Sequence, residues 1–411
     1  MTPHTHFFHL CRHRAAPPSL AAAAAPPVGQ RAFTIIELLV VVSIIGLLIA
    51  ILLPAISNAR TGAKQTMSLS NLRNLGTAHG SYAAEWRDQQ FTLINANMSQ
   101  YGDDAVAAFA AYAAGGSDTA GDDHPGVNLG WGYENGNGAY RLFNYQTRNN
   151  IANARLCEPI VFEGPNFNVN GFFGSFRLIN CRQFNQYVSG KFYDPVFYAP
   201  TDTIVLNSVE GGDSGYNCFD DPGEYCDRPP IAGFGDAPTW SSYILSPAAM
   251  FNPTVLKMRR FGGGSNTGGY QDPYSLAGGF RSPAYGQARY PSLKTHMLEH
   301  HWLQNRRIEC NPAIVGGTYG GCEPHYFNAA WESSPMTLFY DGHVGSVGVR
   351  KAMRADGRIK AQVNGFAGLW SRDTPFGADG YYSGVAYDDQ ALTSFHILTS
   401  DGILGRDIVS E

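Results

Sequence analysis

The sequence predicts an α+β fold, in which one long N-terminal helix packs on a large antiparallel β-rich domain with long loops. Residues 38–53 carry no charge, and the apolar run begins at residue 33. A stripe at spacings of three and four residues follows, as on one face of a helix: Leu72, Leu75, His79, Tyr82 and Trp86. Beyond residue 90, short apolar or aromatic runs alternate with Gly, Pro, Asn and Asp, which is typical of strands and turns.

These observations divide the chain into three parts. Residues 1–32 are rich in His, Ala and Pro and form a leader, residues 33–89 form the helix, and residues 90–411 form the β-rich domain. A helix from Phe33 to about Trp86 would be roughly 80 Å long. Its segment from about 35 to 56 is long enough to span a bilayer. Arg31 precedes this segment, but no A-x-A cleavage site follows it, so the pattern is not that of a conventional signal peptide.

Within the domain, four runs are expected to be strands: residues 191–198, 203–206, 240–245 and 336–340. Residues 103–119 are expected to form a short helix that ends at Gly115-Gly116.

The composition favours an exported protein over a nucleic-acid binder or an enzyme. The formal net charge is −5, and without the leader 26 basic residues stand against 34 acidic ones. No long basic run is present, which argues against nucleic acid as a partner. The glycine-rich run at 261–269 lacks the GK[ST] of a P-loop, and no G-x-S-x-G element occurs. We therefore expect no enzymatic activity and no nucleotide cofactor.

The start of the helix resembles the type IV prepilin cleavage and methylation motif. The stretch reads Ala32-Phe33-Thr34-Ile35-Ile36-Glu37-Leu38-Leu39-Val40. The resemblance implies cleavage by a prepilin peptidase after Ala32, where the family usually has glycine, and N-methylation of Phe33. It also implies that Glu37 pairs with the terminal amine of a neighbouring subunit, and that Pro54 marks a helix kink.

The same resemblance implies a role and a location. The protein would be a pilin or pseudopilin subunit of a type II secretion or type IV pilus-like assembly. It would cross the inner membrane once, with the globular domain in the periplasm or outside the cell. Its partners would be the prepilin peptidase, other pilin-like subunits and inner-membrane lipid. The alternative is an envelope-anchored module that binds glycan or protein and uses the prepilin pathway for sorting only, since about 320 residues follow the helix.

A second resemblance lies near the C-terminal third of the chain. The spacing between Trp331 and Asp341-Gly342 resembles the H-X9-DG element of bacterial prepilin-like proteins, with Trp331 in place of the histidine. From the residues alone, the run through His343 reads as a β-hairpin that turns at Asp-Gly.

The cysteine count is compatible with disulfides in an oxidising compartment. Cys11 lies in the leader, and six cysteines remain after its removal. Sequence neighbours give the simplest pairing, which joins Cys157 to Cys181, Cys218 to Cys226 and Cys310 to Cys322. The alternative is a set of buried free thiols.

Two groups of residues have the composition of metal sites. Four carboxylates surround the central cysteine pair and are compatible with calcium, or form a solvated acidic loop: Asp213, Asp220, Asp221 and Glu224. Some pseudopilins hold calcium in such a loop. His296, Glu299 and His300 fit the H-x-x-E-H spacing of a class of zinc peptidases, which requires a helix. The surrounding sequence is typical of a strand, so a loop or surface cluster is the favoured interpretation.

Overall fold

A computed structural model describes most of the chain. The described residues are 34–94, 97–102, 107–108, 111, 127–133, 139–145, 157–162, 174–211, 216–227, 239–262, 265–299, 334–363, 368–377 and 394–410. The chain divides into two units at the boundary between Ser57 and Asn58, and the first is described from residue 34 on.

Helix α1, Ile35–Glu85, runs without interruption through the boundary between the units. In the first unit its described side chains are exposed to solvent. In the second unit its C-terminal half is part of the core, where Leu72 and Leu75 are fully buried. Gly76 lies against the side chain of Leu338, and a Cβ at this position would stand 2.7 Å from Leu338 Cδ2. The predicted helix and its buried stripe are confirmed, except that Trp86 follows the helix and is 42% exposed.

The central sheet of the second unit has four antiparallel strands in the order β3-β6-β7-β8. The strands are β3 Tyr243–Leu245, β6 Thr295–Glu299, β7 Met336–Phe339 and β8 Val344–Ser346. The first three are buried along their whole length, so both faces of this part of the sheet are covered. Strands β3 and β7 are accordingly mostly apolar, whereas β6 also buries the polar side chains of Thr295, His296 and Glu299.

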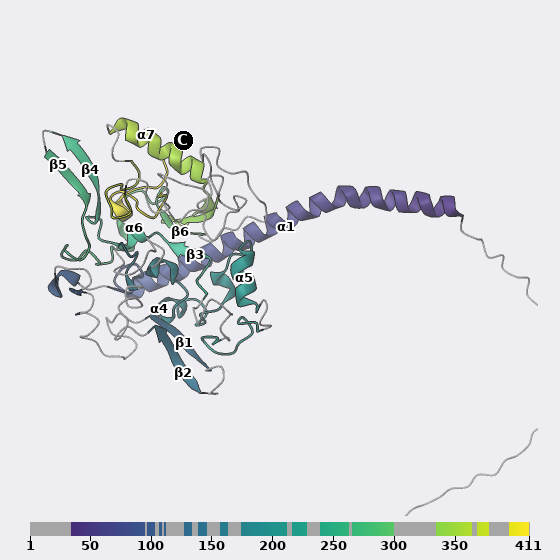
Figure 1. Ribbon diagram of the computed structural model, residues 1–411, viewed down its shortest axis with the longest axis horizontal. Coiled ribbons are helices and arrows are strands. Elements are labelled where there is room, and N and C mark those ends of the chain that lie inside the picture. Colours follow the sequence, from purple (N-terminus) through teal and green to yellow (C-terminus); the bar gives the residue numbers. More distant parts are fainter. Residues whose placement is uncertain are drawn as a thin grey trace, which may run out of the picture. The chain divides into compact units, whose positions relative to one another are not determined.

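Two hairpins stand apart from this sheet (Figure 1). One pairs β1, Val127–Tyr133, with β2, Tyr140–Tyr145. The other pairs β4, Leu256–Gly262, with β5, Ser265–Tyr270.

Short helices fill the connections of the second unit. The α-helices are α4 Arg182–Asn185, α5 Thr203–Val209, α6 Pro247–Met250 and α7 Val349–Gln362. The 3₁₀ turns are η1 Met98–Gln100, η3 Ser175–Arg177, η4 Pro195–Phe197, η6 Tyr285–Gln287 and η7 Gly402–Leu404. Together with the sheets they confirm the α+β class.

Two of the four strand predictions are confirmed and two are wrong. Strands β3 and β7 lie in the predicted runs at 240–245 and 336–340. Residues 203–206 instead begin helix α5, because the Asp202 side chain accepts a hydrogen bond from the Val205 amide (3.2 Å) and caps the helix. Residues 191–198 contain the turn η4. The Asp194 side chain accepts a hydrogen bond from the Val196 amide, and Pro195 occupies the first position of the turn. The predicted helix at 103–119 lies mostly outside the described residues.

Candidate functional site

The first half of α1 presents large apolar side chains to solvent. From Ile35 to Ile56 these side chains are between 45% and 82% exposed. Within the described part of the chain, α1 is the one helix long and apolar enough to cross a membrane. Since such a surface is strongly unfavourable in water, this half of the helix requires a lipid or protein environment.

Glu37 closes a capping box at the start of this helix. The Thr34 amide and hydroxyl both donate hydrogen bonds to Glu37 Oε2, at 2.8 and 2.9 Å. The Glu37 amide donates in return to Thr34 Oγ1 at 3.2 Å. This reciprocal arrangement is the T-x-x-E capping box, which satisfies amides that have no partner in the first turn. Glu37 therefore has a local structural role that the sequence analysis did not consider, and any role in assembly has to be tested separately from it.

Pro54 lies inside α1, and the helix continues on both sides of it. Proline has no amide hydrogen, so the backbone bond to the carbonyl of residue 50 is missing and the helix is locally weaker there.

A buried polar cluster fastens the second half of α1 to the sheet. Ser68 donates a hydrogen bond to Glu299 Oε1 of β6 and shares a second, of 2.9 Å, with the Tyr243 hydroxyl of β3. Glu299 Oε2 accepts from the Met336 amide of β7 at 3.0 Å. Burial raises the pKa of Glu299 to about 6. Ser68 is thus connected to β3 directly, and to β6 and β7 through a carboxyl group that is costly to ionise.

About three turns further along α1, an aromatic cluster continues this contact. His79 Nε2 accepts a hydrogen bond from the Phe91 amide at 3.0 Å. The His79 ring lies 4.4 Å from the ring of His296 of β6, centroid to centroid, and Tyr285 contacts both. Both histidines are fully buried, and burial lowers the pKa of each, that of His79 to about 3. They are therefore neutral and serve as packing groups.

The comparisons with known proteins identify the N-terminal segment. Residues 28–53 match a family described as the prokaryotic N-terminal methylation motif. The chain carries a prepilin-like N-terminal segment. A segment of this type implies processing by a prepilin peptidase, and the apolar helix fits a membrane anchor. No curated protein and no solved structure matches the chain.

The residues at the predicted cleavage point, Ala32 and Phe33, lie outside the described residues, as does Trp331. The structure does describe the predicted Asp-Gly turn. Asp341 and Gly342 connect β7 to β8, and the φ of +83° at Gly342 is one that glycine adopts without strain. His343 lies at the exposed end of the hairpin, where its amide and ring bind Asp341 Oδ1 at 3.1 and 2.5 Å. The predicted β-hairpin with its Asp-Gly turn is confirmed. The contacts of Asp341, Gly342 and His343 are those of an ordinary turn.

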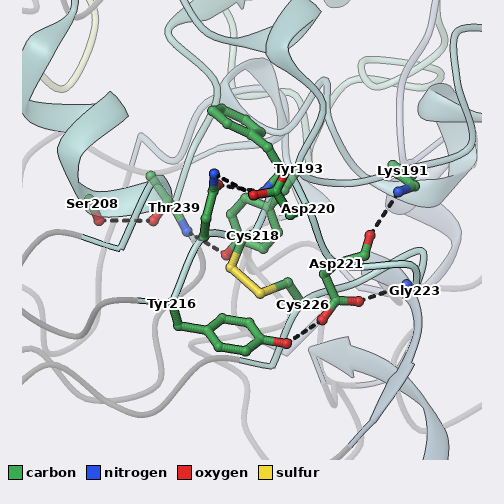
Figure 2. Close-up of a disulfide and its surroundings, with 12 residues drawn as sticks. Lys191, Tyr193, Ser208, Tyr216, Cys218, Asp220, Asp221, Gly223, Cys226 and Thr239 are labelled. Carbon is green, nitrogen blue, oxygen red and sulfur yellow. Dashed lines mark hydrogen bonds between the residues drawn. A yellow bond between two sulfur atoms is a disulfide. The ribbon is translucent and has the colours of Figure 1, made fainter. Parts of the chain in front are cut away.

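One of the three predicted disulfides is present in the structure. Cys218 and Cys226 are bonded, with their Cα atoms 5.5 Å apart (Figure 2). The predicted bond between Cys157 and Cys181 is wrong, because both are free, buried thiols. Burial raises the pKa of each thiol, which disfavours the thiolate that oxidation requires. Cys310 and Cys322 lie outside the described residues.

The carboxylates near this disulfide do not converge on one point. Asp220 accepts a hydrogen bond from the Asn217 side chain (2.9 Å), whereas Asp221 accepts from the Tyr216 hydroxyl (2.6 Å) and the Gly223 amide (2.6 Å) (Figure 2). Glu224 instead pairs with Arg182 at 2.7 Å. Among the described residues no group of three or more His, Cys, Asp or Glu could hold a metal ion. Asp213 lies outside the described residues, so calcium stays a prediction.

The residues of the H-x-x-E-H run do not form the helix that the zinc motif requires. His296 and Glu299 lie on strand β6, and His300 lies outside the described residues. The register of β6 shifts between Thr295 and Met297. His296 packs on His79 and Tyr340, whereas Glu299 binds Ser68, so the two side chains have separate partners.

Sequence reasoning missed the polar residues that fasten α1 to the sheet. Ser68 precedes Leu72 and Leu75 by four and seven residues and so lies on the same helix face. A small polar residue on an otherwise apolar helix face could have indicated this attachment. Glu299, its partner, was noted in the sequence only as part of the H-x-x-E-H spacing.

Proposed function

We propose that the protein is an assembly subunit, a pilin or pseudopilin of a type II secretion or type IV pilus-like machine. It crosses the inner membrane once and holds its globular domain in the periplasm or outside the cell. The supporting observations are the N-terminal methylation motif, the exposed apolar helix half and Glu37 at the start of that helix.

The observation that carries the proposal is the continuity of α1. One helix of 51 residues bears an exposed apolar half and a half that is built into the core of a domain. A removable leader would need no such continuity. A subunit that packs its apolar half among other helices does need it, because the same helix then joins the assembly contact to the domain.

Glu37→Gln tests the assembly role separately from the capping role. Glutamine at this position preserves the capping box, since either Glu or Gln satisfies it, but carries no charge to pair with a terminal amine. Two differently tagged copies of the full chain are expressed together, and their co-purification after crosslinking in the membrane is measured. We expect the glutamine variant to enter the membrane normally and to lose co-purification.

Thr34→Ala is the matched control, because it removes the partner of the capping box and keeps the carboxylate. We expect this variant to retain co-purification. Assembly that survives in Glu37→Gln, or that is lost equally in both variants, contradicts the proposal.

A further inference from the structure

The outer face of the β1–β2 hairpin is an exposed aromatic surface. Trp131 and Tyr133 of β1 are 38% and 61% exposed, and Tyr140, which pairs with Tyr133 across the hairpin, is 53% exposed. The opposite face is packed: a Cβ at Gly132 would stand 2.0 Å from the Tyr225 carbonyl oxygen. The hairpin therefore has one face held against the domain and one face open.

The three rings contact one another. Trp131 and Tyr140 are stacked, with centroids 5.8 Å apart and planes at 16°, and Tyr133 lies 5.1 Å from Tyr140. We name these three residues the aromatic face. Tyr and Trp exposed in this way are typical of the centres of protein interfaces.

An acidic loop packs beside strand β1, against the covered face of the hairpin and next to the backbone of Trp131. The disulfide-bonded segment 216–227 contains four carboxylates and no basic residue: Asp220, Asp221, Glu224 and Asp227. The Tyr225 amide donates to the Trp131 carbonyl at 3.0 Å, and the Trp131 amide donates to Glu224 at 3.1 Å. Two cations lie nearby: Arg182 pairs with Glu224, and Lys191 donates to the Asp221 carbonyl (Figure 2). The loop thus keeps an excess of negative charge, with Asp220 exposed.

Helix α7 presents the complementary surface. Its 14 residues contain five basic side chains, and its one acidic residue, Asp356, is buried against Arg372. The apolar side of the helix is in the core, whereas Arg350, Arg354 and Arg358 are exposed and lie four residues apart on the outer side. Like charges at this spacing repel one another, so an anionic partner would stabilise the helix. We name these three residues the arginine stripe.

We propose that the arginine stripe of one copy docks on the aromatic face and the acidic loop of a second copy. The inference rests on the proposed function, because a subunit of an open assembly needs two different surfaces that fit each other. Figure 1 shows α7 and the β1–β2 hairpin at separate places in the second unit, as a head-to-tail contact requires.

Arginine, rather than lysine, suits such a partner. The planar guanidinium stacks on aromatic rings and pairs with carboxylates at the same time. The chain already uses this contact internally: the guanidinium of Arg177 lies 5.2 Å from the ring of Trp240, and that of Arg372 lies 5.2 Å from Trp370. The same chemistry across two copies would bury exposed rings and neutralise both charged surfaces.

A photo-crosslinking amino acid in place of Tyr133 tests the contact in the full chain in its own membrane. Illumination is expected to give an adduct of twice the chain mass, and peptide mapping is expected to find the crosslink within residues 349–362. A crosslink to another region of the chain, to another protein, or to no protein overturns the proposal. Retention of the purified protein on an immobilised glycan array through the aromatic face would likewise overturn it.

Charge reversal provides the second measurement. Arg354→Glu with Arg358→Glu should reduce the Tyr133 adduct at least tenfold, and Lys257→Glu with Arg260→Glu, an exposed basic pair on β4, should leave it unchanged. If Phe33 is methylated and tagged copies co-purify but neither result is obtained, the docking surface is refuted and the proposed function stands. Loss of co-purification in the unaltered chain refutes the proposed function itself.

Discussion

Glu299→Gln is predicted to make the protein more stable at alkaline pH. The folded state holds the pKa of Glu299 at about 6 because the group is buried, against 4.5 when unperturbed. A raised carboxyl pKa contributes stability that is fully present below pH 4.5 and is lost as the pH rises through 6. A difference of 1.5 pH units corresponds to about 2 kcal/mol. Glutamine mimics the protonated form at every pH, so the variant should gain about this amount relative to the natural chain between pH 4.5 and 8.

The assay is equilibrium unfolding of the full chain in detergent, followed by tryptophan fluorescence at several pH values. The quantity of interest is the difference in unfolding free energy between variant and natural chain, because its change with pH is independent of any constant packing cost. Burial raises the pKa of Asp202 to about 8, and the charge of Glu299 contributes to this rise. Removal of that charge in Glu299→Gln should therefore add to the gain in stability at high pH.

A difference that does not change with pH, or that changes in the opposite direction, would refute the reasoning. Ser68→Ala is the matched control, since it removes one hydrogen bond to the carboxylate and leaves the charge. It should cost more at pH 8 than at pH 4.5, in contrast to Glu299→Gln.

Three further predictions concern the stability of the folded chain. Burial holds the pKa of three histidines well below 6.5: His79, His296 and His396. Each should therefore lower the unfolding free energy by up to about 1.4 kcal/mol per pH unit as the pH falls below 6.5, an effect that protonation of Asp202 and Glu299 partly offsets. Urea midpoints measured from pH 7 to 5 would show this loss. Leu72→Ala should cost about 2–5 kcal/mol in the same assay, and Leu48→Ala in the exposed half of α1 close to nothing. Replacing both Cys218 and Cys226 by serine opens a closed loop of eight residues and should cost about 2–3 kcal/mol.

Each of these three predictions has an outcome that would contradict it. Midpoints that stay constant or rise towards pH 5 would show that the histidines are accessible to protons. Equal costs for the two leucine variants would mean that α1 is not part of the core. Unchanged stability without the disulfide would mean that the acidic loop is ordered by its other contacts alone.

The elements that the sequence predicted correctly are those whose signal is local and strong. The long helix follows from an uninterrupted apolar run and a stripe at helical spacing, and the β7–β8 hairpin follows from Asp341-Gly342 between two apolar segments. Both are set by residues within a few positions of each other, so no knowledge of distant contacts is needed.

The elements that were predicted wrongly depend on capping or on distant partners. Thr203 to Leu206 have β-favouring side chains, but Asp202 begins a helix there. Cys157 and Cys181 have the spacing of a disulfide, yet the fold buries both as thiols. The polar attachment of α1 joins Ser68 to a carboxyl group 231 residues away, which no local pattern could reveal.

Mass spectrometry of the mature N-terminus tests the central claim most directly. The account predicts that the protein isolated from its native membrane begins at Phe33 and that the amine of this residue carries one methyl group. An intact Met1, or a new terminus beyond residue 53, would contradict prepilin processing.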